Sequence, residues 1–216
     1  MSADSLIHPQ IVDLGVMSYG AALEQQYFWH QKVAGGDRPV ILTVEHQPVL
    51  TLGKNASLEY LLFSREHYLN LGVELFETER GGEVTAHMPG QLVVYPIIDV
   101  NKHKLSVRDY VSALESAVIE TLDFFGIPSA LDPQWPGVWV DGAKICAIGV
   151  RVKSRVTMHG LALNINNDLG LFGKIVPCGI SSRSVTSMSR LLGGKVAMPE
   201  VRNQLLKSMV SRLSKV

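Results

Sequence analysis

Two residues at the ends of one strand-rich stretch could together carry out nucleophilic catalysis. Lys144 opens the apolar run 144–150, and Cys178 lies between Pro177 and Gly179. A thiolate is a nucleophile, and a nearby ammonium group lowers the pKa of a cysteine from its usual value of about 8.5. If the fold brings these residues together, Cys178 would form a covalent intermediate, while Lys144 would activate the thiol and transfer protons. The Pro-Cys-Gly sequence favours a loop, from which a thiol can reach a substrate.

Cys146 is the rival nucleophile. On a straight strand it would share a face with Lys144, because side chains alternate with a period of two. It lies within an apolar run, however, and burial there would raise its pKa. We therefore expect Cys146 to be structural. The two cysteines do not form a CxxC motif, so a redox pair is not favoured.

Other polar residues suggest binding rather than metal chemistry. The seven histidines show neither HxxxH nor a cysteine–histidine zinc spacing, so we expect no metal site. His87 and His159 lie near glycines, where each could line a pocket, pair with a cysteine or serve as a hydrogen-bonded structural residue. Arg80-Gly81-Gly82 could bind an anion, although the chain matches neither GxxxxGK[ST] nor GxGxxG.

These residues must be positioned by a mixture of strands and helices. Apolar and β-branched runs predict strands at 11–14, 39–45, 49–52, 73–78 and 91–98, and further strands before and after the turn dipeptide Asp141-Gly142 and over 157–165. Helical spacing predicts helices at 18–34, 64–71, 106–125, 187–192 and 199–213, and Ser106 with Asp109 has the spacing of a capping box. This pattern indicates an α+β or mixed α/β fold.

The composition of the chain narrows the classes of protein to which it could belong. The 216 residues suffice for one large domain or two small ones, and the formal net charge of zero offers no electrostatic case for nucleic acid or an anionic membrane. We see neither a secretory signal nor an apolar run long enough to span a bilayer. Two cysteines favour a reducing compartment, so we expect a cytoplasmic protein.

Four blocks, in order, resemble the octanoyltransferases of lipoic acid biosynthesis, the octanoyl-[acyl-carrier-protein]:protein N-octanoyltransferases. They cover roughly residues 40 to 190 and comprise Arg80-Gly81-Gly82-Glu83-Val84-Thr85-Ala86-His87-Met88-Pro89-Gly90-Gln91-Leu92, Lys144-Ile145-Cys146-Ala147-Ile148-Gly149, His159-Gly160-Leu161-Ala162-Leu163-Asn164 and Val176-Pro177-Cys178-Gly179. The resemblance implies one catalytic domain over residues 1–216. Its α+β fold would be a mixed sheet flanked by helices, like the catalytic domain of the biotin and lipoate protein ligases.

The resemblance also implies a reaction, partners and site residues. Octanoyl-acyl-carrier protein would acylate Cys178 to a thioester, assisted by Lys144, and a lysine of a lipoyl domain would then take the octanoyl group as an amide. The acceptors would be lipoyl domains of 2-oxoacid dehydrogenase complexes and the glycine cleavage H protein, served by a monomeric enzyme without a cofactor. The segments implied to bind substrate are Arg80, Gly81, Gly82, Glu83, Val84, Thr85, Ala86, His87, Ala147, Ile148, Gly149, Gly160, Leu161 and Ala162.

Two departures from the family pattern bear on pocket shape. Ala86 stands where a tyrosine is common, and Met88 stands where a glycine is common. Two alternative functions remain open at this point. An ATP-dependent lipoate–protein ligase would form an adenylate and need no cysteine nucleophile, and a non-catalytic lipoyl-domain-binding module would form no acyl-enzyme.

Overall fold

The larger of two β-sheets forms the centre of the molecule. A computed structural model describes residues 8–176 and 184–214 of the chain. The strand order is β1 (Gln10–Met17), β2 (Val40–His46), β6 (Gln91–Ile97), β10 (Val156–Asn164), β9 (Ala143–Lys153), β8 (Val138–Val140) and β7 (Ala130–Leu131). β1 and β2 are parallel and the other neighbours are antiparallel, so the sheet is mixed.

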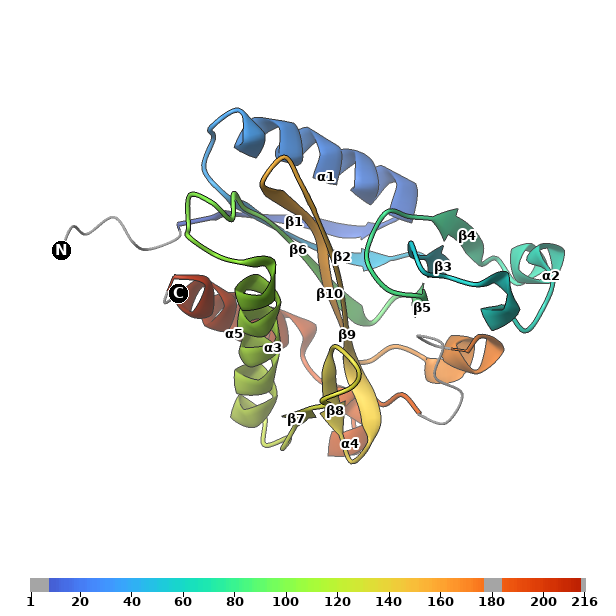
Figure 1. The fold of residues 1–216 in the computed structure, drawn as a ribbon. Helices are drawn as coiled ribbons and strands as arrows, with labels where there is room; N and C mark the ends of the chain where they lie inside the picture. The colour runs from blue at the N-terminus through green and yellow to red at the C-terminus, as the bar shows by residue number, and fades with distance from the viewer. Residues whose placement is uncertain (1–7, 177–183, 215–216) are drawn as a thin grey trace.

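The smaller sheet lies beside the larger one (Figure 1). Its order is β4 (Glu74–Glu77), β3 (Val49–Leu52) and β5 (Val84–His87). Three short helical segments accompany it: α2 (Arg65–Asn70), η2 (Leu58–Tyr60) and η3 (Leu169–Lys174). Side chains from these elements form their own apolar cluster, which includes Leu50, Tyr68 and Phe172.

Helices cover both faces of the larger sheet. α1 (Tyr19–Ala34) packs on β2, β6 and β10, while α3 (Val107–Phe124) and α5 (Met198–Leu213) lie on the opposite face (Figure 1). Alternation along β2 explains this, because Leu42 belongs to the α1 cluster and Ile41 to the α3–α5 cluster. The short α4 (Met188–Leu192) precedes α5. The expected mixed sheet flanked by helices is therefore confirmed.

Local sequence signals set several boundaries as predicted. Ser106 and Asp109 form a complete capping box at the start of α3. Asp141 and Gly142 have φ values of 48° and 77°, which suits the two-residue hairpin between β8 and β9. None of the helices in the described ranges combines the length and apolar character that crossing a bilayer requires.

The sequence analysis missed β5 and β7, and with them the division into two sheets. β5 has four residues and β7 has two, so neither is long enough to show a clear alternation. β5 carries Thr85 and His87 on one side and Val84 and Ala86 on the other, and Glu83 separates it from the glycine pair. Its strand identity depends on pairing with β3, which only the folded chain reveals.

Candidate active site

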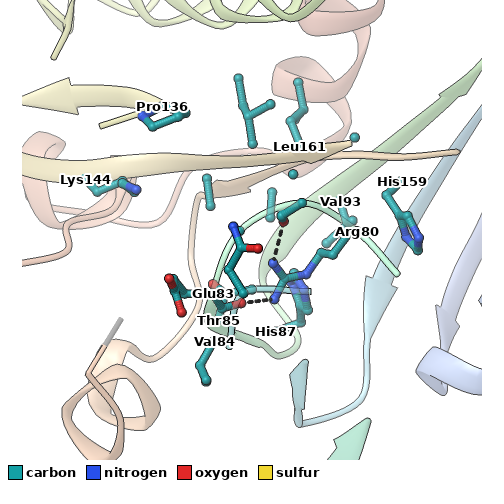
Figure 2. Close-up of a pocket in the computed structure, with 18 of the residues that line it drawn as sticks. Arg80, Glu83, Val84, Thr85, His87, Val93, Pro136, Lys144, His159 and Leu161 are labelled. Atoms are coloured by element: carbon teal, nitrogen blue, oxygen red, sulfur yellow. Dashed lines mark hydrogen bonds between the residues drawn. The ribbon is translucent and has the colours of Figure 1, made fainter. Parts of the chain in front are cut away.

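A cavity of about 350 Å³ lies between β5, with the loop preceding it, and the α1 side of the larger sheet (Figure 2). It collects residues that are far apart in the chain. All the residues expected to bind substrate line it except Ala86, and Lys144 lines it too. The residues that the sequence analysis did not single out are Tyr19, Asn55, Val93, Tyr95, Gln134, Trp135 and Pro136.

The glycine pair places the Arg80 loop directly against other backbone segments. Gly81 N–H donates to Val150 O at 3.0 Å, and a Cβ on Gly149 would come within 3.0 Å of Gly81 O. A Cβ on Gly53 would lie 2.2 Å from Gly82 O, a separation that real Cβ atoms essentially never show. Gly82 also has a φ of +88°, which favours glycine. The close approach is thus to protein backbone, which forms one wall of the cavity.

Arg80 holds this wall together. Its buried guanidinium donates from Nη2 to Thr51 O at 2.6 Å and to Glu83 O at 2.7 Å, and from Nη1 to Gly81 O at 3.0 Å. Nε donates to Thr51 Oγ1 at 3.2 Å. Because these donors are directed at protein oxygens, the described contacts make Arg80 a brace between β3 and the loop that precedes β5 rather than an exposed anion-binding group.

Lys144 lies at one end of the cavity (Figure 2). Its side chain is buried, and its Nζ lies 4.8 Å from the centre of the Trp139 ring. Its backbone pairs with the segment that follows residue 183: Lys144 N–H donates to Ser184 O, and Thr186 N–H donates to Lys144 O. β9 therefore fixes the lysine at the cavity while also anchoring residues 184–186.

Cys178, the expected nucleophile, falls in 177–183, outside the described residues. The chain on either side is placed. Val176 N–H donates to Tyr60 O at 2.8 Å before the segment, and Val185 forms a parallel bridge with Lys144 after it. Phe172 and Val185 also line a small recess together with Lys144. The chain that follows the Cys178 segment thus pairs with Lys144 at the end of the cavity, whereas the chain before it is held by Tyr60.

Cys146 belongs to the apolar core instead. It is fully buried in the α3–α5 cluster, and burial raises its pKa to about 12. The pairing of β9 with β8 shifts register between Cys146 and Lys144, which leaves Ile145 as an extra residue. The straight-strand expectation that Cys146 and Lys144 share a face is wrong for this reason: Lys144 lines the cavity and Cys146 does not.

Aromatic rings and histidines gather at the other end of the cavity. His46, His87 and His159 are buried there near Tyr19 and Tyr95. Burial lowers the pKa of His46 to about 4 and that of His87 and His159 to about 3. These imidazoles are therefore neutral at neutral pH. They come from separate elements, so no spacing in the sequence could have grouped them.

His87 links the two ends of the site through hydrogen bonds. Its Nδ1 lies 2.7 Å from Gln91 Oε1, which can only accept, so Nδ1 carries the proton and Nε2 accepts from Thr51 Oγ1 at 3.4 Å. Gln91 Nε2 donates to Asn164 Oδ1, and Asn164 Nδ2 donates to Thr186 O. Thr186 is the residue that pairs with the Lys144 backbone. His87 thus has an orienting role in the described structure.

The two departures from the family pattern lie behind the cavity wall. Ala86 and Met88 both belong to the apolar cluster of the smaller sheet, and neither lines the cavity. Met88 Sδ accepts a hydrogen bond from Asn167 Nδ2 at 3.2 Å. Within the described ranges, no His, Cys, Asp and Glu side chains are grouped so that three could bind one metal ion.

The mixed sheet with helices on both faces is the fold of lipoate and biotin protein ligases. Solved structures share it. Lipoate-protein ligase A bound with ATP superposes with a TM-score of 0.78 at 15% identity, covering 95% of this chain and 85% of that chain. A bi-partite lipoate protein ligase from Thermoplasma acidophilum, studied with its E2 lipoyl domain, gives 0.75 at 16% identity, covering 96% and 84%. Biotin protein ligase from Aquifex aeolicus gives 0.55 at 15% identity, covering 95% and 69%.

Sequence comparison identifies the family within that fold. The lipoyl protein ligase A/B catalytic domain matches residues 18–210. The octanoyltransferase of Nitratidesulfovibrio vulgaris strain DP4 is 39% identical, covering 93% of this chain and 92% of its own. The octanoyltransferase of Chloroflexus aggregans is 44% identical, covering 92% of both. The chain therefore belongs to the octanoyltransferase family, a family of acyltransferase enzymes.

Proposed function

We propose that this enzyme transfers an octanoyl group from octanoyl-acyl-carrier protein to a lysine of a lipoyl domain through a thioester at Cys178. The Cys178 sulfur attacks the donor carbonyl, and the carrier thiol leaves with a proton. The lysine amine then attacks the enzyme thioester, an amide forms, and the sulfur is released. The donor thioester and the enzyme thioester are similar in energy, so amide formation drives the overall transfer.

The position of Lys144 is the observation that carries this proposal. The Lys144 side chain is buried at the end of an apolar cavity, and the chain that follows the Cys178 segment pairs with the Lys144 backbone there. A cation close to a thiol stabilises the thiolate over the thiol. Lys144 is thus suited to activate Cys178 and to exchange protons with the departing and entering groups. In this scheme Cys178 and Lys144 are the catalytic residues.

The rest of the cavity is suited to an acyl chain. Val84, Val93 and Ala162 contribute apolar surface to it. Each methylene removed from water contributes roughly 0.8 kcal/mol to binding. In this proposal the segments Arg80–His87, Ala147–Gly149 and Gly160–Ala162 bind the substrate, with Ala86 supporting the wall from behind.

Lipoyl domains are the proposed acceptors, those of 2-oxoacid dehydrogenase complexes and the glycine cleavage H protein. The archaeal ligase that shares this fold has an E2 lipoyl domain as its partner. The proposal also places the enzyme in the cytoplasm, for which the low cysteine content is favourable. It further takes the enzyme to be a monomer. Sedimentation of the purified chain at the mass of a dimer would contradict the monomer.

The acyl-enzyme tests the proposal directly. Incubation with octanoyl-acyl-carrier protein should add one octanoyl mass to the intact chain, and peptide mapping should place it on Cys178. Cys178→Ser should form no thioester, whereas Cys146→Ala should be labelled like the wild type. Labelling at Cys146, or adenylate formation from lipoate and ATP with no acyl-enzyme, would contradict the proposed route.

Lys144→Ala tests the activation of the thiol. Without the ammonium group, the pKa of Cys178 should rise, so the iodoacetamide rate profile should move to higher pH by about one unit. Octanoyl transfer should fall by about tenfold or more. Lys153→Ala is the matched control, because Lys153 is exposed at the far end of β9. Identical profiles for Lys144→Ala and the wild type would remove Lys144 from the mechanism.

A further inference from the structure

We propose that the Tyr19 ring closes the far end of the acyl-binding cavity and sets the longest acyl chain that the enzyme accepts. This inference rests on the proposed function, since it takes the acyl chain to enter from the Lys144 end. It assigns a specificity-determining role to a residue of α1, which contributes to none of the recognised sequence blocks.

The course of the cavity follows the strands β9 and β10. Ala147 pairs with Ala162, and Gly149 pairs with Gly160, so two rows of small residues lie side by side on one face. All four line the cavity. His159 pairs with Val150, which is six residues from Lys144 and therefore about 20 Å along the strand. Figure 2 shows Lys144 and His159 at opposite ends of the cavity.

Tyr19 lies at the His159 end. Its hydroxyl is 3.4 Å from His159 Nδ1, and its side chain lines the cavity although it is almost fully buried. The ring centre is 5.0 Å from that of Phe76 and 5.2 Å from that of His46. The Tyr19 ring thus stands between the cavity and Phe76, so removing it would lengthen the accessible space.

The wall is held rigidly on both sides. Tyr19 is the first residue of α1, immediately after the N-cap Ser18, whose Oγ accepts from Ala21 N–H. His159 has a φ of +58°, and its N–H donates to Gln26 Oε1 of α1 at 2.8 Å. Two separate contacts therefore join α1 to β10 at this point. A longer acyl chain would have to displace a packed ring rather than a flexible side chain.

This geometry predicts a length profile with a sharp upper limit. Each additional methylene that enters the cavity should improve the specificity constant by about fourfold, the equivalent of its burial free energy. Once the chain reaches Tyr19, further methylenes should gain nothing and should lower the rate by about tenfold or more. The buried histidines beside the ring, His46 and His159, are neutral and place no charge against the chain end.

The experiment measures acyl-enzyme formation by intact mass, using carrier-protein thioesters with even chain lengths from hexanoyl to tetradecanoyl. The wild type should show a maximum followed by a sharp fall. Tyr19→Ala should raise the dodecanoyl-to-octanoyl rate ratio by about tenfold. Tyr19→Phe keeps the ring, so it should keep the wild-type length profile. An unchanged ratio in Tyr19→Ala would overturn the proposal.

The chain-length series on the wild type remains informative even if the Tyr19→Ala variant does not fold. If circular dichroism shows that Tyr19→Ala does not fold, Tyr19→Leu replaces it as a smaller truncation. The wild type alone also tests the assignment, because the absence of an upper length limit would overturn it. Failure of the proposed function looks different. In that case the wild type forms no Cys178 thioester with any donor, whereas failure of this inference alone leaves octanoyl labelling intact.

Discussion

At the residue scale, the burial of Cys146 determines which of the two cysteines we expect to react. Cys146 is enclosed by the core between the larger sheet and α3, where its thiol is held protonated. Cys178 belongs to the segment between the anchored residues Val176 and Ser184. Reactivity toward electrophiles follows thiolate population and access, and burial at Cys146 removes both.

Iodoacetamide should therefore distinguish the two thiols. In the native protein at pH 8 we expect one carbamidomethyl group, on Cys178, and a second on Cys146 only after denaturation. Cys146→Ala should leave the native labelling stoichiometry and the octanoyl transfer rate within about twofold of the wild type. Two modified thiols in the native protein would show that Cys146 is more accessible than its burial indicates.

The buried histidines couple stability to pH. The pKa of His46, His87 and His159 lies well below the usual 6.5, because burial disfavours the charged imidazolium. Above pH 6.5 these residues are neutral in both states, so they leave stability independent of pH. Between pH 6.5 and about 4 the unfolded chain binds protons that the native protein does not. Stability therefore falls with decreasing pH, by about 1.4 kcal/mol per pH unit for each histidine.

Urea denaturation at several pH values measures this dependence. Replacing one buried imidazole, as in His46→Gln, removes one group that takes up a proton on unfolding. Between pH 6 and 5, the slope of the unfolding free energy against pH should therefore fall by about 1.4 kcal/mol per pH unit. The matched control is His67→Gln, since His67 is exposed on α2. Equal slopes for His46→Gln and the wild type would show that His46 already binds a proton in the native state.

At the scale of elements, α3 is defined by its cap as well as by its apolar face. Ser106 Oγ accepts from Asp109 N–H at 3.1 Å, and Asp109 Oδ2 accepts from Ser106 N–H at 3.2 Å. This reciprocal pair satisfies backbone donors that the first helical turn leaves open. Packing of α3 on β8, β9 and β10 supports the strand that carries Lys144.

Ser106→Ala should destabilise the protein by about 1 kcal/mol, because a helix N-cap is lost. For a chain of this length, the melting temperature should fall by about 2–4 °C. Ser112→Ala is the control, since Ser112 is exposed within the same helix and alanine favours helix there. Differential scanning calorimetry measures both variants. A Ser106→Ala melting temperature equal to that of Ser112→Ala would argue against the cap.

At the scale of the whole molecule, the cavity depends on two sheets meeting. β5 supplies Thr85 and His87 from the smaller sheet, while β9 and β10 supply the opposite wall from the larger one. Glycines allow the close fit: a Cβ on Gly160 would lie 2.2 Å from Val94 O of β6. Gly160 is therefore required for strand packing, independently of any role in binding substrate.

The single catalytic domain over residues 1–216 remains a prediction, and thermal unfolding tests it. If both sheets belong to one cooperative unit, calorimetry should show one transition with a van't Hoff enthalpy close to the calorimetric enthalpy. Circular dichroism and tryptophan fluorescence should then give the same midpoint. Two resolved transitions would indicate that the smaller sheet and its helices unfold separately.

The sequence by itself determined the helices, the long strands, the α3 capping box and the β8–β9 turn, because periodicity, caps and turn residues are local properties of a chain. It also singled out Lys144 and set Cys146 aside as a buried thiol. Only the tertiary structure decided what shares the cavity. Tyr19, Arg80 and His159 come from different elements, and β5 becomes a strand only through its pairing with β3. Such contacts depend on how sheets pack, and no spacing along a sequence records that.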